Sequence, residues 1–98
     1  MSGKGYWIAM VDISDPENYP KYIAANAAAF EKYGARFLVR GGRHEDPEGP
    51  SGDRHVVVEF ESYEKALACY HSPEYQAALK LRQASASARF AIVEGAET

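Results

Sequence analysis

At 98 residues the chain is long enough for one domain with a thin core, because a domain of this size buries about two-thirds of its unfolded surface or less. Fourteen acidic and eleven basic residues give a net charge of −3 with no clustered Lys and Arg, which excludes the usual nucleic-acid or anionic membrane binder. The single cysteine, Cys69, excludes an internal disulfide and a multi-thiolate metal site, and it suits a reducing compartment.

The first predicted element is a strand from Tyr6 to Ile13, whose near-continuous apolar run is typical of a central strand. The residues before it are too few and too polar for the core of a signal peptide, and no apolar run of the chain approaches the length of a membrane span. We therefore expect a single domain, residues 1–98, of a cytoplasmic protein with no membrane partner.

A helix is predicted next, starting at Ser14-Asp15-Pro16-Glu17, where a capping side chain, a proline and an early acid follow one another. It is expected to run to about Tyr33, with Gly34 as its C-terminal stop. Residues spaced three and four apart form its apolar stripe: Tyr19, Tyr22, Ile23, Asn26, Ala27, Phe30 and Tyr33. Asn26 is the polar member of that stripe, and it is either bonded to backbone or water or placed on a pocket wall.

Two further strands are predicted, from Arg36 to about Arg43 and from about Arg54 to Glu61. Alternation places one set of polar residues on a single face of the expected hairpin, namely Arg36, Arg40, His55 and Glu59. In that register Arg40 and Glu59 are expected to be partners.

The segment between these strands is rich in Pro, Gly and acids and is predicted to be an irregular loop. It contains metal-ligating residue types, His44, Glu45 and Asp46, with His55 just beyond it. Their spacing fits neither a helical nor a hairpin site, and loops of this composition are usually just solvated, so we expect no metal site.

A second helical segment is predicted from the Ser62 cap to His71, and Ser72-Pro73-Glu74 then starts another helix in the same way. Arg82 ends the apolar stripe of that helix, where a cation is favoured by the helix dipole alone or serves a ligand. A last strand is expected from Ala88 to Val93.

The order β-α-β-β-α-β predicts an α+β, ferredoxin-like fold with a four-stranded antiparallel sheet, its first and third strands central, and both helical segments on one face. The other face would expose apolar side chains beside charged ones. Packing of two sheets face to face in a homodimer would cover it.

Several short motifs together resemble the family known as domain of unknown function 1330. They are, in chain order, Gly5-Tyr6-Trp7-Ile8, Leu38-Val39-Arg40-Gly41-Gly42, Val57-Val58-Glu59-Phe60, Ser72-Pro73-Glu74-Tyr75-Gln76, Arg82 and Val93-Glu94-Gly95. The resemblance implies a dimeric α+β barrel. Barrels of this kind include monooxygenases without a cofactor, isomerases, haem proteins and proteins of no known catalysis, so it implies no particular activity.

Two functional hypotheses follow. In the first, the chain is an enzyme of the cofactor-independent oxygenase or isomerase type, acting on a small anionic or enolisable organic molecule without any cofactor. Its expected ligand-binding residues are Tyr22, Asn26, Arg40, His55, Glu59, Tyr70 and Arg82. The catalytic candidates are His55 as general base, Arg40 for a carboxylate or enolate, and Glu59.

In the second, the protein is a non-catalytic dimeric metabolite-binding or accessory protein that uses the same cavity. A plain structural alternative for the polar residues is an Arg40–Glu59 ion pair that seals the dimer interface. A cavity on the order of 300 Å³ that faces a base would favour the enzyme.

Overall fold

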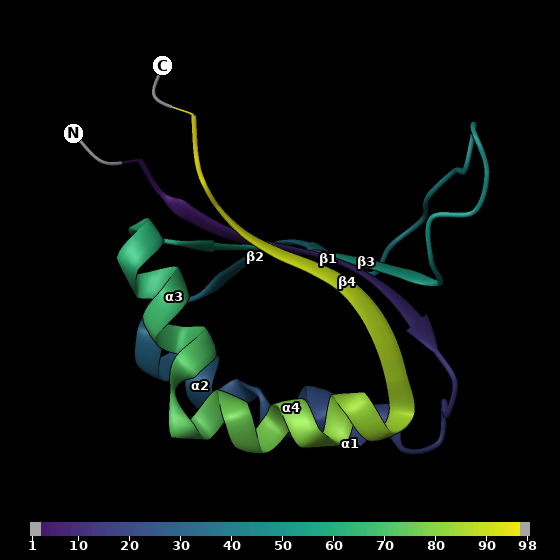
Figure 1. The fold of residues 1–98 in the computed structure, drawn as a ribbon, viewed down its shortest axis with the longest axis horizontal. Coiled ribbons are helices and arrows are strands. Elements are labelled where there is room, and N and C mark those ends of the chain that lie inside the picture. Colours follow the sequence, from purple (N-terminus) through teal and green to yellow (C-terminus); the bar gives the residue numbers. More distant parts are fainter. Residues whose placement is uncertain (1–2, 97–98) are drawn as a thin grey trace.

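The computed structural model describes residues 3–96, which form one antiparallel sheet and four helices. The elements in chain order are β1 (Gly5–Ile13), α1 (Tyr19–Ala25), α2 (Ala27–Tyr33), β2 (Arg36–Arg40), β3 (Arg54–Phe60), α3 (Tyr63–His71), α4 (Pro73–Ser85) and β4 (Ala86–Glu94). The strand order is β2-β3-β1-β4, with β3 and β1 in the centre. All four helices lie on one side of the sheet (Figure 1). The predicted ferredoxin-like fold is therefore confirmed.

The first helical segment differs from its prediction at both its start and its middle. The side chain of Asp15 accepts hydrogen bonds from the backbone N–H of Asn18 and from its Nδ2, at 3.3 and 2.7 Å. These bonds stabilise a turn over residues 16–18, so the helix begins at Tyr19 instead of Pro16. The segment is also interrupted once, at Asn26, which ends α1 and precedes α2.

The second helical segment is as predicted. Ser62 accepts a hydrogen bond from the N–H of Lys65 and caps α3, and Ser72 accepts one from Tyr75 and caps α4. Ser72 also donates from its hydroxyl to the carbonyl of Cys69, at 2.7 Å, and so connects the end of one helix to the start of the next.

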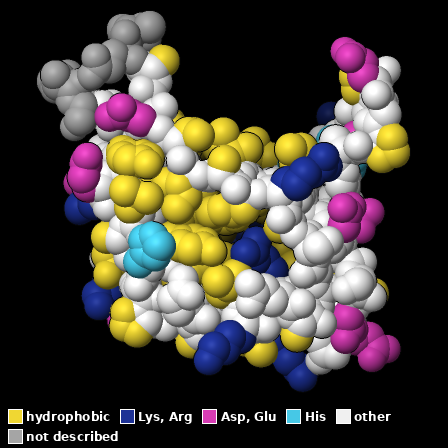
Figure 2. All heavy atoms as spheres, in the orientation of Figure 1, with side chains coloured by type: hydrophobic (Ala, Val, Ile, Leu, Met, Phe, Trp, Pro, Cys, Tyr) yellow, Lys and Arg dark blue, Asp and Glu magenta, His cyan; other side chains and the backbone are white. Residues whose placement is uncertain are grey.

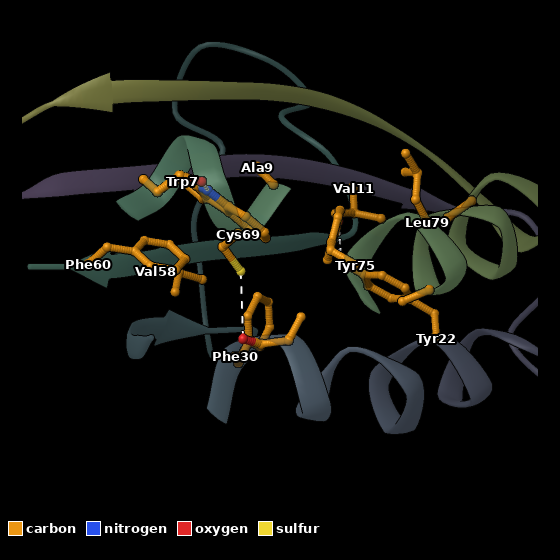
Figure 3. Close-up of a cluster of buried hydrophobic side chains, with 14 of the residues drawn as sticks. Trp7, Ala9, Val11, Tyr22, Phe30, Val58, Phe60, Cys69, Tyr75 and Leu79 are labelled. Carbon is orange, nitrogen blue, oxygen red and sulfur yellow. Dashed lines mark hydrogen bonds between the residues drawn. The ribbon is translucent and has the colours of Figure 1, made fainter. Parts of the chain in front are cut away.

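The core lies between the sheet and the helices and is mainly aromatic. Trp7 projects from β1 and donates from Nε1 to the carbonyl of Ala66 at 2.9 Å. Its ring lies 4.7 to 6.0 Å, centroid to centroid, from five other aromatic rings, and these belong to Phe30, Phe60, Tyr70, Tyr75 and Phe90. Figure 3 shows Trp7, Val58 and Phe60 on the strands lying opposite Phe30 on α2 and Tyr75 on α4.

β2 carries an irregularity that changes which side chains share a face. Phe37 pairs with Val58, but Val39 pairs with Val57 and Arg40 with Val56, so the register shifts at Leu38. A bulge of this kind inserts one extra residue and reverses the alternation after it. Arg40 is thereby turned to the same side as Val56, the side that faces the helices.

The expected Arg40–Glu59 partnership is therefore wrong. Glu59 pairs across the strands with Arg36, and their charged groups approach to 3.9 Å. The alternation that predicted Arg40 on the same face as Glu59 holds only for the first part of β2, before the bulge.

The opposite face of the sheet has no covering layer. Apolar side chains that lie on it or at its edge are largely exposed, including Ile8 (40%), Leu38 (46%) and Val93 (38%). The β2–β3 loop and the ends of β1 and β4 project away from the helices on either side of this face (Figure 1). Within residues 3–96, no helix is long and apolar enough to cross a membrane.

Candidate functional site

A cavity lies between the sheet and the helix layer. Its floor is formed by the helix-facing side chains of the strands, and its roof by α1, α2 and α4. The lining residues are Trp7, Ala9, Val11, Tyr19, Tyr22, Ile23, Asn26, Phe30, Phe37, Arg40, Arg54, Val56, Val58, Arg82 and Phe90. Figure 2 shows a hollow between β4 and α4, with apolar side chains around it and a basic side chain inside.

Three arginines, Arg40, Arg54 and Arg82, line this cavity from β2, β3 and α4. None of the other lining residues is acidic, and among residues 3–96 no carboxylate lies within ion-pair distance of any of the three. Three guanidinium groups stay charged at any physiological pH. The cavity therefore carries a positive charge that the protein itself leaves uncompensated.

Two of these guanidinium groups are also short of hydrogen bonds. The Nε atoms of Arg54 and Arg82 are buried and have no hydrogen-bond partner within the described part of the chain. Arg82 is 8% exposed, and its Cζ lies 5.9 Å from the ring centroid of Tyr22 and 5.3 Å from that of Phe90. Buried polar groups normally have partners, so these two Nε donors are the unsatisfied polar atoms of the cavity lining in the described residues.

Arg40 is held differently, since it is exposed and its guanidinium lies over the ring of Phe37, with Cζ 4.1 Å from the centroid. Of the three arginines it has the greatest freedom to move. It lies next to Val56 in the β2–β3 pairing and so borders the cavity floor.

Tyrosines form part of the opposite wall. The hydroxyl groups of Tyr22 and Tyr75 lie 2.8 Å apart and share a hydrogen bond. Burial raises the pKa of Tyr75 far above its usual range, so this residue stays neutral. Burial also raises the pKa of Tyr19, although the charges of Arg54 and Arg82 act in the opposite direction.

The cavity is small in this structure. The space between its walls amounts to about 470 Å³ with the open mouth included, but only about 30 Å³ admits the centre of a water molecule. The smaller volume, about 30 Å³, is the one that compares with the volumes of ligand sites, and it corresponds to roughly two waters. It falls below the 300 Å³ expected of an enzyme site, so a larger ligand must displace side chains, and Arg40 at the edge is the freest of them.

The seven predicted site residues do not share one pocket. Four of them line the cavity: Tyr22, Asn26, Arg40 and Arg82. Tyr70 packs in the core instead, with its ring centroid 6.0 Å from that of Trp7. His55 and Glu59 lie on the open face of the sheet, because they alternate with Val56 and Val58, which face the helices.

This placement corrects the expectation that His55 acts as a base beside Arg40. His55 pairs across the sheet with Met10, and Glu59 accepts a hydrogen bond from the hydroxyl of Tyr6 at 3.0 Å. That hydrogen bond raises the pKa of Tyr6. Both candidates are separated from the cavity by the sheet itself.

Arg54 is the lining residue that the sequence analysis missed. The signal was present, because strand alternation puts residue 54 on the same face as Val56, Val58 and Phe60. Its position at the start of the strand, next to a long loop, obscured that face assignment.

This architecture, a four-stranded antiparallel sheet with all helices on one face, is the ferredoxin-like fold. The chain matches the family described as Domain of unknown function (DUF1330) over residues 4–96, and it belongs to that family. No curated protein matches the chain.

Solved structures share the fold at low sequence identity. RPA0582, a protein of unknown function from Rhodopseudomonas palustris, is 20% identical with a TM-score of 0.79, over 100% of this chain and 86% of that one. SnoaB from Streptomyces nogalater, described as a cofactor-independent oxygenase, is 12% identical with a TM-score of 0.63, over 99% and 97%. A dimeric protein of unknown function and ferredoxin-like fold from Bacteroides fragilis is 18% identical with a TM-score of 0.58, over 95% and 97%.

Proposed function

We propose that the cavity binds a small organic anion through Arg40, Arg54 and Arg82. The observation that carries this proposal is the uncompensated charge of three guanidinium groups, two of which have a buried Nε without a partner. A carboxylate or enolate supplies a negative charge for the guanidinium groups and oxygen acceptors for their unpaired N–H donors. The planar fork of a guanidinium suits two such oxygens. The aromatic walls favour a flat, partly apolar body on that anion.

The chemistry that fits such a site is that of an enzyme acting on an enolisable molecule, of the cofactor-independent oxygenase or isomerase type. Guanidinium groups in an enclosed site stabilise a developing enolate. Because no His, Asp or Glu lines the cavity in the described residues, the substrate must be acidic enough to enter as its anion. In the oxygenase case a bound carbanion whose carbon keeps one hydrogen adds molecular oxygen to give a peroxide anion, which takes up a proton. The O–O bond of this hydroperoxide then breaks as the carbon gives up its hydrogen, so that water leaves and a ketone remains.

SnoaB, described as a cofactor-independent oxygenase, supports this choice of chemistry by its shared fold alone. The second candidate is a non-catalytic metabolite-binding or accessory protein. The small cavity and the absence of a base among its described lining residues favour that candidate.

A panel of anions tests the binding step. Benzoate, salicylate, acetylacetonate and dimedone are titrated against the wild type and against Arg54→Gln and Arg82→Gln, with thermal unfolding as the readout. A ligand at 100 times its Kd adds about 2.7 kcal/mol to the free energy of unfolding of the wild type. Arg43→Gln, which removes the same charge from the exposed loop, serves as the control. Equal stabilisation of all four proteins would contradict the proposal.

An oxygen electrode then separates the two candidates. Consumption of oxygen with a bound enolate and no added cofactor supports the enzyme, and consumption must fall in the Arg82→Gln variant. Saturable binding with no consumption and no isomerised product supports the accessory protein.

We also propose that the protein is a homodimer acting in the cytoplasm, with the open faces of two sheets packed together. The exposed Ile8, Leu38 and Val93 support the dimer, and the buried free thiol of Cys69 is consistent with a reducing compartment. Ile8→Lys should give a monomer in sedimentation at micromolar concentration, because a cation would be buried at the interface. The control is Leu81→Lys, at an equally exposed site on α4. A wild-type monomer would remove the idea.

A further inference from the structure

The β2–β3 loop folds back so that two histidines and a carboxylate meet beside the start of β3. One ligand atom each from His44, Asp46 and His55 lies within 4.8 Å of the other two. The rings of His44 and His55 are 4.2 Å apart between centroids, and His44 Nε2 is 3.6 Å from Asp46 Oδ2. Ser51 links the group, since its hydroxyl donates to Asp46 and lies 2.8 Å from His55 Nε2.

We propose that His44, Asp46 and His55 bind a divalent transition-metal ion such as Zn²⁺. Imidazole and carboxylate are ligands of this ion, whereas Mg²⁺ and Ca²⁺ prefer sites made of oxygen alone. Three protein ligands leave a fourth position for water or for the hydroxyl of Ser51.

The present spacing is close to that of a bound site. Tetrahedral ligands at 2.0 to 2.2 Å from zinc lie about 3.4 Å from one another. The three ligand atoms therefore have to approach by about 1.4 Å at most, starting from 4.8 Å. His44 and Asp46 are exposed on a loop and can move by that amount through side-chain rotation.

The protein alone does not satisfy every hydrogen-bonding atom of His55. Ser51 has one hydroxyl proton, and the carboxylate of Asp46 can only accept, so His55 Nε2 must be the donor towards Ser51. The other nitrogen, Nδ1, is buried without a partner in the described residues. Since Nε2 is the nitrogen beside Ser51, an ion bound within the group takes the place of the proton on Nε2, and binding should release that proton.

The proposed metal site is separate from the arginine cavity. The loop projects from the sheet on the side away from the helices (Figure 1), whereas the cavity lies between the sheet and the helices. Neither His44 nor His55 lines that cavity. A bound ion would tie the loop to β3 whether or not an organic anion is present.

Titration of the full chain with ZnCl₂ by isothermal calorimetry tests the proposal, with MgCl₂ as the comparison ion. One Zn²⁺ per chain is expected, with no saturable heat from Mg²⁺. His44→Ala and His55→Ala should each weaken the affinity by about 100-fold or more, because even residues that only support a ligand contribute 10- to 100-fold. The matched control is His71→Ala, which removes the remaining histidine, on α3, and should leave the affinity unchanged.

A measurement on the wild type keeps the proposal testable if a variant fails to fold. Zn²⁺ should shift the amide NMR signals of residues 41–55 and leave those of α1 and α4 in place. Absence of Zn²⁺ binding, binding that survives in the His44→Ala/His55→Ala double variant, or binding lost in His71→Ala would each overturn it.

Discussion

Arg82 offers a test that separates a functional cation from a structural one, because its contacts within the protein only balance the cost of burying it. In Arg82→Met the buried Nε donor without a partner disappears, which gains about 1 to 3 kcal/mol. The contacts with Tyr22 and Phe90, at 5.9 and 5.3 Å, are lost, which costs about 0.5 to 2 kcal/mol. The favourable position in the last turn of α4 is lost as well, at about 0.3 to 1 kcal/mol.

These terms nearly cancel, so the ligand-free variant should unfold within about 1 kcal/mol of the wild type, or about 4 to 8 °C in Tm. The bound state should differ. With a saturating anion from the panel above, the wild type should gain about 2.7 kcal/mol at 100 times Kd and the variant almost nothing.

Thermal and urea unfolding with and without the anion measure both quantities, with Arg43→Met as the control for loss of an exposed charge. A loss of 3 to 5 kcal/mol in the ligand-free variant would refute the reasoning, because that is the cost of breaking a buried ion pair or network. It would mean that Arg82 holds the fold together and is not kept free for a ligand.

Three further predictions concern single contacts. A double-mutant cycle of Arg36→Ala with Glu59→Ala should give a coupling of about 1 kcal/mol or less, because the Arg36 side chain is 76% exposed, and the same cycle with Arg40→Ala should give none. Burial raises the pKa of Cys69 from 9.0 to about 12, so the stability that the neutral thiol contributes is full below pH 9 and is lost as pH rises towards 12. Over that range the free energy of unfolding of Cys69→Ala should fall with pH less steeply than that of the wild type, by up to about 1.4 kcal/mol per pH unit. Identical pH profiles of the two proteins would contradict this. Ser72→Ala should lower the free energy of unfolding by about 1 to 2 kcal/mol in urea, since it removes the cap of α4, and a loss under about 0.3 would show that the cap is dispensable.

The sequence by itself determined the order of the strands and of the two helical segments, because strand alternation and helix caps depend on local chemistry. The caps at Ser62 and Ser72 act within three residues of the chain, and strand alternation at Val56 and Val58 needs no knowledge of the partner strand. The central place of β1 followed in the same way from its apolar composition.

The candidate site depended on features that are not local. The bulge at Leu38 exists only in the pairing of β2 with β3. Because of it, the side chain of Arg40 lies on the helix-facing side of the sheet, whereas Glu59 lies on the other side. The turn at Asp15 competes with a helix start that the Pro16 motif also permits, and the structure has the turn.

The same holds for the histidines. His44 and Asp46 meet His55 only because an irregular loop folds back on the sheet, and no repeat or spacing in such a loop encodes that contact. Side chains alternate between the two faces of a strand, so one extra residue reverses their assignment. This is why only the tertiary structure separated Arg40, which borders the cavity, from His55 and Glu59, which lie on the other face of the sheet.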